Sequence, residues 1–118
     1  APHTIFNGRI GRSRRFATQQ YDIARLRAVA DASGGTLNDV ALAICAGGLR
    51  DYLLGLDALP EKSLIAMLPV NIRPKDDPGG GNAVGAILAT LGTDIADARE
   101  RIEAISASPQ VSRPPRRR

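Results

Sequence analysis

The stretch GGTLNDVALAICAGGLRDYL, residues 34–53, sets the architecture of this chain. Two glycines open it, and Thr36 and Asp39 follow in the Thr-x-x-acid pattern of a helix start, in which two side chains satisfy the first free backbone amides. The pattern predicts a helix that begins after Thr36, ends near Leu54 and is apolar on nearly every side. A surface helix carries a single apolar stripe, so this helix is expected to lie inside a larger structure.

Two features inside this helix indicate the same burial. Gly47 and Gly48 each lower helix stability by about 1 kcal/mol relative to alanine, and close packing of another backbone against them is the expected reason. Cys45 is the single cysteine, so the chain cannot form an internal disulfide. Because it lies within the apolar run, we expect a buried thiol of low reactivity.

The residues before this helix predict one further helix and one short strand. Residues 14–21 suit a short strand, and the lead-in before them has no periodicity. Asp22 is a suitable N-cap for a helix over residues 23–33, which carry apolar side chains at helical spacing. Gly34 then ends that helix, because glycine adopts the left-handed C-cap conformation without strain.

The residues after it predict two strands and a loop between them. Residues 63–74 form a continuous apolar run, as expected for a strand covered on both faces, with an edge or a bulge at Pro69 because proline lacks the ladder donor. Residues 83–91 are a second strand candidate, and the glycine-rich residues 76–82 are expected to be a loop. Arg73 suits a buried ion pair or a phosphate contact, and we favour the ion pair.

A third capped helix completes the pattern. Asp94 and Asp97 repeat the capping pattern and are expected to open it. Along this helix one face is apolar, with Ile95, Ala98, Ile102 and Ile105. Residues 109–118 change to proline and arginine and are expected to be a disordered basic tail. The sequence thus predicts an α/β chain with about three helices and two to three strands.

The net charge of +4 is unevenly distributed. Four arginines lie between residues 9 and 15 and four more at the C-terminus, whereas the chain between them holds 8 basic and 12 acidic residues. A nucleic-acid-binding domain carries its basic residues on the folded surface with stacking aromatic side chains, and only 3% of these residues are aromatic. We therefore expect no specific nucleic-acid partner. No apolar run reaches the roughly 20 residues of a membrane-spanning helix.

Five stretches have an order and a spacing that can be compared with known families. They are FNG at 6–8 with RRFA at 14–17, residues 34–53, LPVNIRP at 68–74, GN at 81–82, and DIADARERIEAI at 94–105. Together they resemble the wax ester synthase/diacylglycerol acyltransferase family of bacterial acyl-CoA-dependent O-acyltransferases. The resemblance implies two α/β lobes with the active site in the channel between them. It makes residues 1–108 a fragment, a partial lobe from the middle region and the start of the second lobe.

The sequence also departs from the family pattern. The family's catalytic motif, two adjacent histidines followed after three residues by Asp-Gly, does not occur in these 118 residues. Its second histidine is the implied general base that takes the proton of the acceptor hydroxyl. His3 is the only histidine, and it lies in the lead-in without an acidic neighbour. We therefore expect no catalytic residue, no metal site and no resident cofactor in this chain, and no activity of the chain alone.

Four residues are candidates for substrate binding because they match two family motifs. Asn7 and Gly8 keep the Asn-Gly pair of the family's Pro-Leu-Asn-Gly motif, and Asn38 and Asp39 match its Asn-Asp motif. The resemblance implies that they lie along the substrate channel. Asn-Gly is also a common turn, so both roles stay open for that pair. For the other pair we favour a structural role, Asp39 through the helix cap and Asn38 through hydrogen bonds to a neighbouring segment.

Two functional hypotheses follow. In the first, the chain is part of an acyltransferase that moves fatty acyl groups from acyl-CoA to diacylglycerol or a long-chain alcohol, in triacylglycerol or wax ester synthesis. It would then bind acyl-CoA and the acyl acceptor only together with the missing lobe. In the second, it is a non-catalytic remnant or an interaction module that self-associates through its apolar helix. We expect a cytoplasmic location, with which peripheral association with a membrane or a lipid droplet is compatible.

Overall fold

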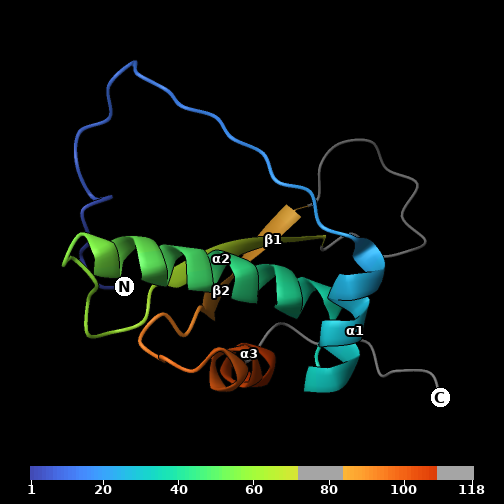
Figure 1. Ribbon diagram of the computed structural model, residues 1–118. Helices are drawn as coiled ribbons and strands as arrows, with labels where there is room; N and C mark the ends of the chain where they lie inside the picture. The colour runs from blue at the N-terminus through green and yellow to red at the C-terminus, as the bar shows by residue number, and fades with distance from the viewer. Residues whose placement is uncertain (72–83, 109–118) are drawn as a thin grey trace.

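The computed structural model describes residues 1–71 and 84–108. In chain order these form α1 (Ile23–Ser33), α2 (Leu37–Gly55), β1 (Ile65–Asn71), β2 (Val84–Thr90) and α3 (Ala98–Ala107). α2 lies across one face of the two-stranded sheet, and α1 and α3 pack against α2 (Figure 1). Three helices and two strands confirm the predicted α/β class. The expected loop at 76–82, Arg73 and the expected tail at 109–118 lie outside the described residues.

α1 begins and ends where the sequence predicts. The Asp22 carboxylate accepts a hydrogen bond from the Ala24 N–H at 3.0 Å, and Gly34 ends the helix in the left-handed conformation, with a φ of 71°. The strand expected over residues 14–21 is wrong, because these residues form no regular structure and are all exposed. A strand needs a partner for its backbone groups, and no described strand pairs with this segment.

α2 begins with the predicted capping box. The Thr36 N–H donates to Asp39 Oδ2 at 2.8 Å, and the Asp39 N–H donates to Thr36 Oγ1 at 3.2 Å. The helix is buried along one side only. Four large side chains elsewhere on it stay exposed: Leu37, Ile44, Tyr52 and Leu54. The expectation that Cys45 is buried is wrong, because this thiol is also exposed.

Among the described residues, no second backbone packs against the two glycines inside α2. A Cβ built on Gly47 would lie 3.2 Å from Nη1 of Arg101, and one built on Gly48 would meet nothing within 4 Å. The expectation of close backbone packing is therefore wrong for both. Gly47 makes room for a guanidinium group from α3, whereas Gly48 has open space beside it.

β1 and β2 pair antiparallel, with Met67 opposite Leu88. These two side chains are 72% and 70% exposed, whereas Ala66 and Leu68, on the other face of β1, pack against the core. The expectation of a first strand covered on both faces is wrong for the described residues. In this part of the chain β1 pairs with β2 alone, and Pro69 suits such an edge strand because it lacks the N–H that a central strand needs.

α3 begins later than the paired acidic residues suggest. Asp97 is the N-cap and accepts a hydrogen bond from the Glu100 N–H at 3.4 Å, whereas Asp94 lies in the turn before the helix. Gly92, with a φ of 69°, and a bond of 2.9 Å from the Ile95 N–H to its carbonyl form that turn. The predicted role of Asp94 as an opening residue is therefore wrong.

The core lies between α2, α3 and the inner face of the sheet, with a second cluster beside α1. Small and branched side chains fill both: Leu42, Ala46, Leu91 and Ile105 in one, and Ala30, Val40 and Ile102 in the other. Within residues 1–71 and 84–108, no helix has both the length and the apolar character needed to cross a bilayer.

Candidate functional site

Asp39 lies at the start of α2 and is fully buried although it carries a carboxyl group. Besides closing the capping box, its Oδ2 accepts a hydrogen bond from Ser106 Oγ of α3 at 3.2 Å. Burial of a polar or charged group is costly unless hydrogen bonds replace those of water. The bonds to Oδ2 offset that cost and link the start of α2 to α3.

Gly35 allows α3 to approach this carboxylate. A Cβ at this position would lie 2.8 Å from Ser106 Oγ and 3.1 Å from Asp39 Oδ2, both shorter than ordinary van der Waals contacts. The second glycine of the quoted stretch is therefore needed for packing between helices. The sequence pattern alone shows it only as the residue after a helix end.

Asn38 has a different environment from its neighbour. It is exposed, and its side chain makes no hydrogen bond with any described residue. The bond expected to a neighbouring segment is thus absent from this part of the chain. With 3.6 residues per turn, adjacent helix positions point about 100° apart, so one residue of the pair can be buried while the other meets solvent.

Asn7 organises a turn in the lead-in. Its Oδ1 accepts a hydrogen bond from the Thr4 N–H at 2.8 Å, and its own N–H donates to the Thr4 carbonyl at 3.0 Å. The Phe6 ring stacks on Tyr52 of α2, with ring centroids 6.3 Å apart and planes inclined by 14°. This stack attaches the turn to the C-terminal half of α2. A Cβ on Gly8 would meet nothing within 4 Å, so local packing does not require glycine there.

The two candidate pairs lie at opposite ends of α2. Asp39 is in its first turn, and the Asn7 turn contacts Tyr52 near its end. The rise of 1.5 Å per residue separates these helix positions by about 20 Å. The structure therefore does not bring Asn7 and Asp39 together, and any ligand that touches both pairs has to extend along the helix.

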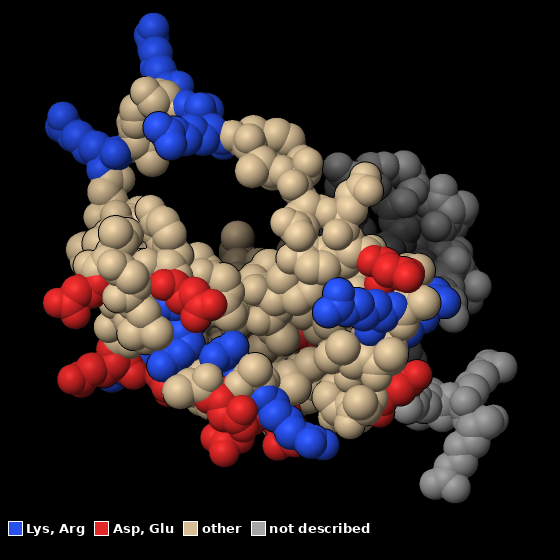
Figure 2. Space-filling model, in the orientation of Figure 1, with Lys and Arg blue, Asp and Glu red and all other residues tan. Residues whose placement is uncertain are grey.

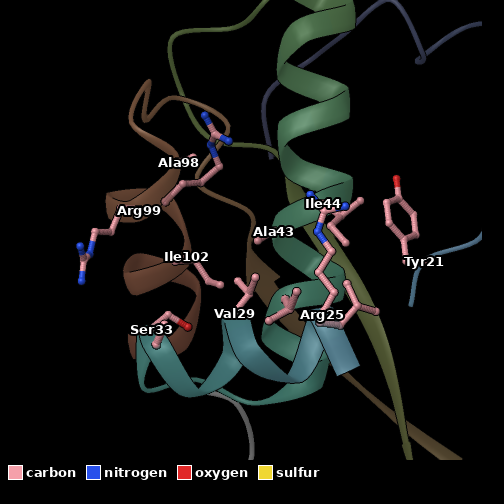
Figure 3. A pocket seen from close by; sticks show the side chains of 13 residues that line it. Tyr21, Arg25, Val29, Ser33, Ala43, Ile44, Ala98, Arg99 and Ile102 are labelled. Atoms are coloured by element: carbon pink, nitrogen blue, oxygen red, sulfur yellow. The ribbon is translucent and has the colours of Figure 1, made fainter. Parts of the chain in front are cut away.

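An apolar groove of about 530 Å³ opens between the three helices. Figure 3 shows Val29 of α1, Ala43 and Ile44 of α2, and Ile102 of α3 along its walls. Arginines 25, 99 and 101 also line it. Such a groove suits an apolar chain or an apolar protein segment. Sequence reasoning missed it, although the nearly all-apolar character of α2 was a signal that part of this helix needs a cover.

Two arginines that the sequence did not single out hold the turn between β2 and α3. Arg101 is 7% exposed, and its Nε and Nη2 donate to the carbonyls of Ile95 and Ala96, each at 3.0 Å. Arg50 of α2 donates through Nη1 to the Thr93 carbonyl at 2.7 Å. Helical periodicity places these side chains but does not show that they are anchored to backbone oxygens.

The described residues hold no group of three or more His, Cys, Asp or Glu side chains that could bind a metal ion. His3, the single histidine, is exposed in the lead-in.

Comparison with known proteins agrees with the resemblance seen in the sequence. Residues 1–41 match the wax ester synthase/diacylglycerol acyltransferase catalytic domain. Over 113 residues the chain is 60% identical to a putative diacylglycerol O-acyltransferase of Mycobacterium tuberculosis. This alignment covers 96% of this chain and 23% of that protein. It is 46% identical over 113 residues to the O-acyltransferase WSD of Acinetobacter baylyi, covering 96% of this chain and 24% of that protein.

The solved structure of the wax ester synthase/diacylglycerol acyltransferase from Marinobacter aquaeolei VT8 aligns with 90% of this chain, at 44% identity and a TM-score of 0.76. The chain corresponds to a segment of the wax ester synthase/diacylglycerol acyltransferase family. Its three helices and antiparallel sheet match 23% of that solved chain, and it spans about a quarter of the length of the curated relatives it matches. The substrate-binding roles of Asn7, Gly8, Asn38 and Asp39 stay predictions.

Proposed function

We propose that this chain forms part of an acyltransferase that transfers fatty acyl groups from acyl-CoA to diacylglycerol or a long-chain alcohol. The observation that supports this most is the 44% identity and TM-score of 0.76 with the Marinobacter wax ester synthase/diacylglycerol acyltransferase. The alignment covers 90% of this chain, which supports its correspondence to a homologous segment of a longer protein.

In this proposal α2 is a wall of the substrate channel. Its exposed side carries Leu37, Ile44 and Leu54, which give an apolar surface, and Asn38 supplies an exposed amide near its start. Asp39 does not touch substrate. It holds the N-terminal end of this wall through its bonds to Thr36 and Ser106.

The chain alone is proposed to be inactive. In the reaction, the acceptor hydroxyl oxygen attacks the thioester carbonyl, a C–O bond forms, the C–S bond breaks, and the hydroxyl proton passes through a base to the leaving CoA thiolate. Loss of a general base typically slows such a step by a factor of about 10²–10⁴. The exposed His3 lies in a lead-in with no helix or strand to position it, and a single wall positions the reactants poorly.

The test is to mix the purified chain with labelled palmitoyl-CoA and either hexadecanol or diacylglycerol, with and without the remaining part of the Acinetobacter O-acyltransferase WSD expressed separately. We expect ester only in the mixture with both parts. A chimera in which this chain replaces its aligned segment of WSD should also be active. Ester formed by the chain alone, and abolished by His3→Ala, would overturn the proposal, as would a folded but inactive chimera.

A second candidate function is that of an interaction module that self-associates. The groove of about 530 Å³ and the exposed apolar side chains of α2 favour it, because large exposed apolar patches drive association. The two proposals differ in the oligomeric state of the chain in solution.

A further inference from the structure

Residues 8–20, here named the basic loop, connect the Asn7 turn to α1 and contain no helix or strand. Every one of them is exposed, and in Figure 1 the segment arches away from the helices. Phe16 is 90% and Ile10 86% exposed, which makes them the most exposed large apolar side chains among the described residues. The described residues leave both side chains uncovered, so they are available to a surface outside this part of the chain.

The basic loop also carries a concentrated positive charge. It contains four arginines, and no acidic residue occurs between Ala1 and Tyr21. Nη1 of Arg14 donates to the carbonyls of Gly11 and Ser13 at 2.6 and 2.9 Å, which fixes a bend in the loop. The other three arginines make no hydrogen bond or ion pair with any described residue: Arg9, Arg12 and Arg15. Figure 2 shows Lys/Arg side chains projecting from this loop, clear of the body, where both signs of charge are mixed.

We propose that the basic loop binds the surface of an anionic lipid membrane. The guanidinium groups contact lipid phosphates, and Ile10 and Phe16 enter the boundary between the headgroups and the acyl chains. Clusters of basic residues next to apolar and aromatic side chains have this affinity, because charge attraction and apolar burial act together. The inference rests on the loop itself and does not depend on acyltransferase activity.

The apolar residues favour a membrane over a nucleic acid. A phosphodiester backbone would also attract the arginines. It offers no apolar environment for Ile10, however, and single-strand binding uses several aromatic platforms where this loop has only Phe16. A lipid surface uses both kinds of side chain.

The test is co-sedimentation of the chain with vesicles of phosphatidylcholine alone or of phosphatidylcholine mixed with phosphatidylglycerol. We expect binding only to the mixed vesicles, and its loss as the salt rises from about 0.1 M to about 1 M and the screening length falls from about 10 to about 3 Å. Neutralising Arg9, Arg12 and Arg15 together to Gln should weaken binding roughly a hundredfold, at about fivefold for each arginine. The control combines Arg27→Gln with Arg99→Gln and removes two exposed charges outside the loop. It should change binding less than about threefold, which is smaller than the effect of one arginine at the membrane surface.

A fluorescence measurement tests the apolar contact separately. The chain has no tryptophan, so Phe16→Trp places a single reporter on the loop, and Met67→Trp places one at a similarly exposed site on the sheet. Mixed vesicles should shift the emission of the loop reporter to the blue and leave the sheet reporter unchanged. Three outcomes would each overturn the proposal. They are equal binding to vesicles with and without phosphatidylglycerol, a blue shift at position 67 alone, and loop-dependent retention on RNA without retention on vesicles. Far-ultraviolet circular dichroism checks that the variants stay folded.

Discussion

Ser106 Oγ donates a hydrogen bond of 3.2 Å to Asp39 Oδ2, across 67 positions of the chain. The same oxygen accepts the Thr36 N–H, so one buried atom closes the start of α2 and fastens α3 to it. Local and tertiary structure therefore share a single acceptor.

Asp39→Ala should lower the free energy of unfolding by about 1.5–5 kcal/mol. Loss of a helix cap costs about 0.5–2 kcal/mol, and a buried donor left without its partner costs a further 1–3 kcal/mol or so. Urea denaturation measures the change. Asp97→Ala is the matched control, because it removes an exposed cap with one bond of 3.4 Å, and it should cost less. Equal costs would show that the burial of Asp39 and its bonds beyond the cap add nothing to stability.

Gly35→Ala should destabilise the fold by about 1–3 kcal/mol, the usual cost of overpacking, because the added Cβ would lie 2.8 Å from Ser106 Oγ. Ser106→Ala removes that atom. In its background the cost of Gly35→Ala should fall by at least about 0.5 kcal/mol, as coupled neighbours do in a double-mutant cycle. Strictly additive effects would mean that the contact of the added Cβ with Asp39 Oδ2 at 3.1 Å, and not the one with Ser106, requires glycine.

Gly48→Ala should raise the free energy of unfolding by about 0.5–1 kcal/mol, since alanine is the better helix former and the new methyl group meets nothing within 4 Å. Gly47→Ala, one position earlier on the same helix, should gain less because its methyl group would lie 3.2 Å from Nη1 of Arg101. The pair is compared by thermal denaturation. Equal gains would contradict the placement of Arg101.

Replacing Phe6 and Tyr52 by Leu, singly and together, should show a coupling of about 0.5 kcal/mol. Stacked aromatic pairs contribute about 0.5–1.5 kcal/mol beyond burial, and both rings are half exposed here. A double-mutant cycle in urea measures it. No coupling would show that the Asn7 turn is held by its own hydrogen bonds alone.

The chain should self-associate at high micromolar concentration, because the groove between the helices exposes apolar surface. Sedimentation velocity over a concentration series measures this. Ile44→Ser, on the groove wall, should weaken association, whereas Arg27→Ser on the outer surface should not. A clean monomer that binds no hydrophobic dye would rule out the self-associating module.

Local signals predicted much of the fold. The Asp22 cap, the left-handed Gly34 and the Thr36–Asp39 box each depend on residues within a few positions of one another, and all three are present. The start of α3 was misplaced because the left-handed Gly92 turns the backbone at a point that the spacing of two aspartates does not show. The strand prediction over 14–21 was wrong because a strand depends on a partner strand, and local sequence does not show whether the chain supplies one.

Burial was predicted less well, for one physical reason. Burial was inferred at Cys45 from the apolar run around it and at Gly48 from the cost of glycine inside a helix. Both inferences hold only where the chain itself supplies the covering structure. The chain spans about a quarter of its curated relatives, and both residues are exposed. Of the candidate site, the cap at Asp39 was foreseeable from spacing, whereas its bond to Ser106, the groove and the anchor of Arg50 on Thr93 arise only when distant segments meet.

Because Cys45 is exposed, its thiol can serve as a natural site for chemical footprinting. As the only thiol in the sequence, it can be alkylated at one position without any engineered label. Cys45 does not line the groove, but it is exposed on α2 next to Ile44, which does, so its alkylation rate would report whether a second copy, a complementary lobe or a lipid surface covers α2 beside the groove. Measuring the alkylation rate of Cys45 by mass spectrometry can thus compare all three kinds of binding without a substitution in the chain.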